Sequence, residues 1–119
     1  MDFLKNLFRP DKAFVPTPTQ SVPGLEPIVV QAIENFFPSI DDQKLAITYV
    51  LDLKKKGRMF RNDPKLLLSL LSYSEGKIES LKSAASETHP HFWFEEIGPI
   101  FPKMKAAEEW VKSITKPQV

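Results

Sequence analysis

The residues with the clearest potential for chemistry are two histidines and two glutamates near position 90. His89 and His91 flank a proline, and Glu95 and Glu96 follow closely. Imidazole and carboxylate groups are ligands that zinc and other divalent ions accept. However, the spacing matches no known ligand signature, and a capping or loop role at a helix start explains both histidines more simply. We predict no metal site, and a metal-dependent enzyme that uses His89, His91 and Glu95 is kept as a hypothesis to be tested.

A run of basic residues forms the second candidate site. The side chains that we expect to contact phosphate, if the run binds a nucleic acid, are Lys54, Lys55, Lys56, Arg58 and Arg61. Phe60 lies inside the run and could stack on a base. Lysines at the C-terminal end of a helix also stabilise the helix dipole, which explains the first three without a ligand. An accessory nucleic-acid-binding subunit is therefore the alternative function, and an anionic lipid surface is a related ligand for the same run.

The chain has no pattern of residues that is typical of an enzyme. It has no cysteine, which excludes disulfides, thiolate nucleophiles and cysteine-ligated metals. It also has no glycine-rich phosphate loop and no nucleophile with a base at a known spacing. Adjacent carboxylates such as Glu108 and Glu109 project in different directions from a helix and make a poor catalytic pair. We predict a non-catalytic protein without a cofactor.

Aromatic residues gather toward the C-terminus and suggest a binding surface for another protein. The residues concerned are Phe92, Trp93, Phe94, Phe101 and Trp110. Exposed aromatic side chains are common anchors of protein interfaces. A small helical domain also needs large side chains to fill its core, so most of the five should be buried. We predict that Phe92 and Trp93 contact a partner.

The first 25 residues differ in composition from the rest. In residues 1–8, four apolar side chains fall on one face of a short amphipathic helix: Phe3, Leu4, Leu7 and Phe8. Residues 9–25 are rich in proline and predict a linker, or a strap over the domain. The short helix could bind a partner protein or a membrane surface, or it could fold back over its own core.

Residues 26–116 predict a helical domain. Apolar residues recur every three to four positions, and no segment shows the alternation of a half-buried strand. Pro27 suits the start of the first helix, and Pro38 ends it. Ser39 and Asp42 resemble a capping box for a second helix that stops at Gly57 and forms an αα-hairpin with the first.

The second half of the domain contains the next helices. Asn62, Asp63 and Pro64 mark a helix start, and five leucines between positions 66 and 71 predict a central helix buried on several sides. Residues 63–87 form either one long helix or two, and Gly76 favours a break at residues 73–76. One or two helical turns should precede Gly98, and a last amphipathic helix should follow Pro102.

Together these patterns predict an all-α fold, a small orthogonal or bundle-like domain of four to six helices with a proline-rich N-terminal extension. The chain has 119 residues, enough for one domain, with 16 basic and 15 acidic residues that nearly cancel. Because the chain has no strong overall charge, binding to nucleic acid or to an anionic membrane would need a local basic patch. The start of the chain lacks a secretory signal, so we expect a cytoplasmic protein, either free or peripheral to a membrane. Its expected function is that of a protein-interaction module, an adaptor or assembly subunit.

Overall fold

The protein is all-α, as the periodicity predicted. The computed structural model describes residues 15–57, 60 and 63–115, and within these ranges it contains no strand. The helices are α2 (Pro27–Phe36), α3 (Ile40–Lys56), α4 (Pro64–Ser74), α5 (Ile78–Ser86) and α6 (Met104–Ile114). Between α5 and α6 lie a π-helix, η2 (Phe92–Ile97), and a 3₁₀ turn, η3 (Gly98–Ile100). The amphipathic helix predicted for residues 1–8 lies outside the described residues.

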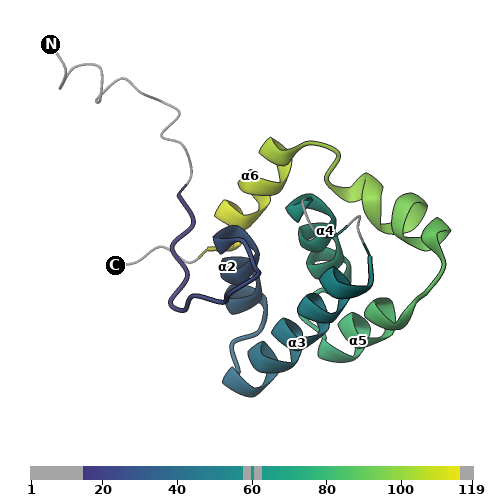
Figure 1. Cartoon of the computed structure of the whole chain (residues 1–119). Helices are drawn as coiled ribbons and strands as arrows, with labels where there is room; N and C mark the ends of the chain where they lie inside the picture. The colour runs from purple at the N-terminus through teal and green to yellow at the C-terminus, as the bar shows by residue number, and fades with distance from the viewer. Residues whose placement is uncertain (1–14, 58–59, 61–62, 116–119) are drawn as a thin grey trace, which may run out of the picture.

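Helix α4 is the centre of the domain. It contacts α2 and α6 on one side and α5, η2 and η3 on the other (Figure 1). Its leucines are at most 7% exposed, and they are Leu66, Leu67, Leu68, Leu70 and Leu71. Neighbours on both sides explain why apolar residues fill more than one face of this helix. The central helix predicted from the leucine run is therefore confirmed.

The helix starts follow the sequence signals with one exception. Asp63 caps α4 by accepting a hydrogen bond from the Lys65 amide over 3.1 Å, and Pro64 occupies the first turn. Ser39 is the N-cap residue of α3, but its side chain makes no capping hydrogen bond, so the predicted capping box is wrong. The side-chain amide of Gln43 links the first turn of this helix to the end of α2 by donating to the Phe37 carbonyl over 2.8 Å.

A sharp turn separates α4 from α5, so residues 63–87 form two helices and not one. The turn contains Glu75 and Gly76, whose φ angles are 53° and 75°. Two successive residues in the left-handed region cannot continue a right-handed helix. The break falls at residues 75–77, within one residue of the predicted position.

The described part of the proline-rich segment is a strap over α2. The Thr17 amide donates to the Gln31 side chain over 2.9 Å. The Thr19 amide and hydroxyl both donate to the Glu34 carboxylate over 2.8 Å. Leu25, at the end of the strap, is buried in the core. Figure 1 shows the strap running beside α2. Of the two arrangements predicted for residues 9–25, the strap is the one seen from Thr17 onward.

The buried side chains form one continuous core with an aromatic cluster on either side of α4. Trp110 packs against Phe36 and Phe101, with both pairs of ring centroids 5.1 Å apart. Phe60 meets Trp93 edge to face at 4.8 Å. Both clusters adjoin the same set of buried aliphatic residues. None of the described helices has the length and apolar character that crossing a membrane requires.

Candidate interaction groove

The two histidines and two glutamates considered as metal ligands lie near one another on the surface. His91 Nε2 lies 3.0 Å from Glu95 Oε2, one helical turn away, and both side chains are more than 60% exposed. His89 is exposed and lines the same hollow as His91 and Glu96. Among the residues that the structure describes, no group of three or more acidic or histidine side chains is placed to hold an ion. The arrangement resembles a surface hydrogen-bonded pair more than a zinc centre.

Two of the three lysines of the basic run are paired within the protein. Lys54 Nζ lies 3.1 Å from Glu26 Oε1 and donates to the Gly24 carbonyl over 2.7 Å. Lys56 forms an exposed ion pair with Asp52, and Lys55 is exposed. The contacts of Lys54 tie α3 to the segment before α2, and the Lys56–Asp52 pair lies within α3. The role of the lysines at the negative end of the helix dipole stays a prediction.

The aromatic residue of the basic run faces the core. Phe60 is 3% exposed, so the prediction that it stacks on a base is wrong for this conformation. Its burial follows from its edge-to-face contact with Trp93. Arg58 and Arg61 lie outside the described residues. Nucleic-acid binding through this run stays a prediction without support from the described part of the run.

Three consecutive aromatic residues of η2 enter three different environments. Phe92 is half-buried, Trp93 is 3% exposed, and Phe94 is 57% exposed. The Trp93 indole N–H donates to the Glu87 carbonyl over 3.2 Å, which satisfies its polar group in the core. The predicted partner contact of Trp93 is therefore corrected, because the side chain is inaccessible. Phe94 lines a separate hollow of about 390 Å³ beside Pro99 and Pro102.

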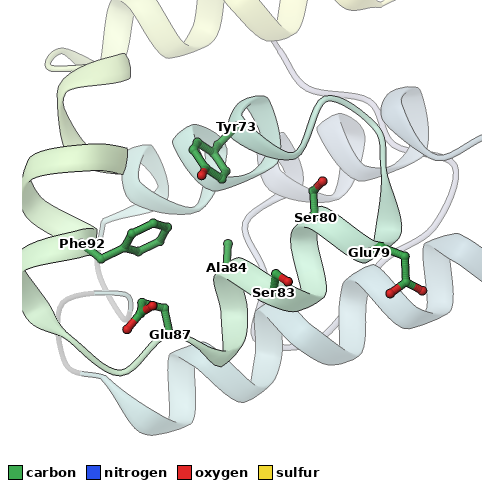
Figure 2. A pocket seen from close by; sticks show the side chains of 7 residues that line it. All are labelled: Tyr73, Glu79, Ser80, Ser83, Ala84, Glu87 and Phe92. Carbon is green, nitrogen blue, oxygen red and sulfur yellow. The ribbon is translucent and has the colours of Figure 1, made fainter.

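Phe92 is the predicted contact residue that the structure places at a concave surface. A groove of about 370 Å³ lies between α4, α5 and the start of η2 (Figure 2). Its lining residues are Tyr73, Glu79, Ser80, Ser83, Ala84, Glu87 and Phe92. Figure 2 shows Tyr73 reaching in from α4 and Phe92 from η2, with Ser80 and Ala84 on the α5 side. We call this hollow the α5 groove.

The aromatic wall of the α5 groove is fixed by packing. The rings of Tyr73 and Phe92 meet at 87° with their centroids 5.9 Å apart. Phe92 also meets the buried Trp93 edge to face at 5.5 Å, which anchors it to the core. Tyr73 nevertheless remains 45% exposed. The groove therefore presents apolar ring surface to solvent from a largely prearranged position.

The charged groups of the α5 groove are acidic. Glu79 in the first turn of α5 and Glu87 at its C-cap provide carboxylates at the two ends of the helix (Figure 2). One Glu87 oxygen accepts hydrogen bonds from the Thr88 and His89 amides over 3.1 Å and 3.3 Å, so this side chain also fixes the following turn. Among the described residues that line the groove, none is a lysine or an arginine.

The sequence analysis missed most of the groove. It named Phe92, but not Tyr73, Glu79 or Glu87. A tyrosine at the end of a leucine-rich helix is an available signal, since its polar hydroxyl suits the edge of a core. The carboxylates carry no such signal, because exposed glutamates are ordinary on helices.

Comparison with protein-family models, with curated proteins and with solved structures finds no match for this chain. Any functional conclusion therefore rests on the residues and geometry of the chain itself.

Proposed function

We propose that this domain is a non-catalytic protein-interaction module, an adaptor or assembly subunit, and that the α5 groove binds a segment of another protein. The observation that carries the proposal is the pair of rings of Tyr73 and Phe92, held in place by the core while Tyr73 stays half exposed over a hollow. Aromatic side chains in such positions contribute much of the binding energy of protein interfaces, because they offer large apolar area at little cost in conformational entropy.

The shape and chemistry of the groove support a peptide-like ligand. It lies alongside a helix of nine residues and is about 370 Å³ in volume, room for a few side chains of an extended or helical segment. The hydroxyls of Ser80 and Ser83 offer hydrogen bonds to such a backbone. Both apolar and polar contacts are thus available within one hollow.

The N-terminal peptide extends this proposal. The partner-binding face predicted for this peptide lies outside the described part of the chain. It consists of Phe3, Leu4, Leu7 and Phe8. A tether to a partner protein or to a membrane surface remains the function that we propose for them. Deletion of residues 2–8 should then abolish recruitment and leave the melting temperature of the remaining chain nearly unchanged.

A quantitative capture experiment tests the groove. The full chain and three variants, Tyr73→Ala, Phe92→Ala and Phe94→Ala, are used as bait in an extract of the source organism. Proteins bound through the α5 groove should be recovered at least about fivefold less with the first two variants, because each removes an aromatic anchor. Phe94→Ala is the matched control, since it removes an exposed ring of the same segment outside the groove.

The folded state of each variant is checked by its melting temperature before the comparison. Tyr73→Ala is the more informative change, because its side chain is 45% exposed and its loss should affect stability little. Equal recovery of every protein with the wild-type chain and with Tyr73→Ala would refute the proposed role of the groove.

A further inference from the structure

We infer, on the basis of the function proposed above, that the segment bound in the α5 groove is basic and places a lysine or arginine side chain against the rings of Tyr73 and Phe92. Three features of the described structure favour such a ligand: the charge of the groove, the faces of its rings and the adjoining surface.

The charge of the groove is the first feature. Glu79 and Glu87 are the carboxylates among its described lining residues, and neither forms an ion pair within the described part of the chain. Lys82 also belongs to α5 and lies three residues after Glu79, one turn along the helix, but it does not line the groove and forms no ion pair with Glu79 among the described residues. The groove is therefore negative although the whole chain carries a net charge of +1. A cationic ligand is complementary to this local charge.

The geometry of the rings is the second feature. Tyr73 and Phe92 are nearly perpendicular, at 87°, with centroids 5.9 Å apart. A cation beside such a pair can lie within about 6 Å of both centroids, which is the range of an attractive cation–π contact. A neutral apolar side chain would fill the same corner but would leave the carboxylates of Glu79 and Glu87 without a cationic partner. The acidic ends and the ring corner together favour a side chain with an apolar stem and a cationic head.

The surface next to the groove is the third feature. A second hollow of about 530 Å³ shares Glu87 and Phe92 with the groove and adds Glu96, His89 and His91 to the lining. This surface adds one further carboxylate, that of Glu96, past the C-terminal end of α5. A segment that crosses both hollows would meet carboxylates along its path, so its basic residues need not be limited to one.

Selection from a random peptide library tests the inference without knowledge of the partner. The immobilised full chain is the target, and a Tyr73→Ala chain is used to remove peptides that bind elsewhere. We expect the remaining peptides to be enriched in lysine and arginine. Their affinity for the double variant Glu79→Gln, Glu87→Gln should be about fivefold lower than for the wild-type chain. Glutamine keeps an oxygen that can accept the Thr88 and His89 amides, so the turn is preserved.

A matched variant and the pattern of outcomes make the test decisive. Glu108→Gln, Glu109→Gln removes two charges from α6, which does not line the groove, and should leave affinity unchanged. Groove-dependent peptides that lack basic residues, or that bind both double variants equally, would overturn the inference and leave the proposed function standing. Failure to select any peptide that depends on Tyr73 would overturn the proposed function itself.

Discussion

Ser69 is a buried polar residue whose replacement should not harm the protein. Its side chain is fully buried in α4, and its hydroxyl has no hydrogen-bond partner among the described residues. An unsatisfied buried hydroxyl costs about 1–3 kcal/mol, and alanine favours a helix more than serine does. We therefore expect Ser69→Ala to raise the free energy of unfolding by about 1 kcal/mol, measured by urea denaturation.

Ser74 provides the matched control on the same helix. It is also buried, but its hydroxyl donates to the Leu71 carbonyl over 2.7 Å. Ser74→Ala loses this bond, so it should not raise the free energy of unfolding as Ser69→Ala does. We expect the free energy of unfolding to fall or to stay the same. Equal destabilisation by both changes would contradict the argument and would indicate that Ser69 has a partner outside the described residues.

At the scale of the elements, the turn between α4 and α5 depends on Gly76. Its φ angle is 75°, and a Cβ atom at this position would lie 3.1 Å from the Phe36 carbonyl oxygen at the end of α2. Gly76→Ala should therefore lower the free energy of unfolding by about 1–3 kcal/mol, because both the left-handed backbone and the contact oppose a side chain. Thermal or urea denaturation measures the change.

The adjacent residue tests whether backbone conformation is the cause. Glu75 is exposed and also left-handed, with a φ angle of 53°. Glu75→Gly removes the strain that a side chain causes at a positive φ angle, which favours the folded state. It also raises the conformational entropy of the unfolded chain, which favours the unfolded state. The free energy of unfolding should therefore change little. A loss of stability from Glu75→Gly as large as that from Gly76→Ala would contradict the explanation.

The elements of this fold were largely predictable because their ends carry strong local signals. Pro27 and Pro64 restrict the backbone at helix starts, and the Asp63 side chain caps α4 with a hydrogen bond. Gly57 follows the last residue of α3, and Gly76 supplies the left-handed turn after α4. The Ser39 capping bond was predicted wrongly, because a favourable residue type at the N-cap does not fix the orientation of its side chain. The strap was left open as an alternative, because its contacts join residues 14–15 positions apart in the sequence.

At the scale of the whole molecule, the groove could not be predicted because it depends on how separate elements meet. Helical periodicity distinguishes a buried face from an exposed one, but it does not show which neighbouring element each of three consecutive rings of η2 meets. In the structure Trp93 enters the core, Phe92 reaches the groove and Phe94 faces solvent. Tyr73 joins Phe92 only through tertiary packing across 19 residues of chain.

The single core predicts that the two ends of the molecule unfold together. The chain has two tryptophans, and they lie in different aromatic clusters: Trp93 beside Phe60, and Trp110 between Phe36 and Phe101. Both clusters adjoin the leucines of α4, so loss of that helix from the core exposes both. In the single-tryptophan variants Trp93→Phe and Trp110→Phe, the fluorescence transition should therefore coincide with the loss of helical circular dichroism during urea denaturation. A fluorescence change of Trp110 at lower urea than the circular dichroism transition would show that α6 separates from α2 and α4 first, and that the domain is two cooperative units.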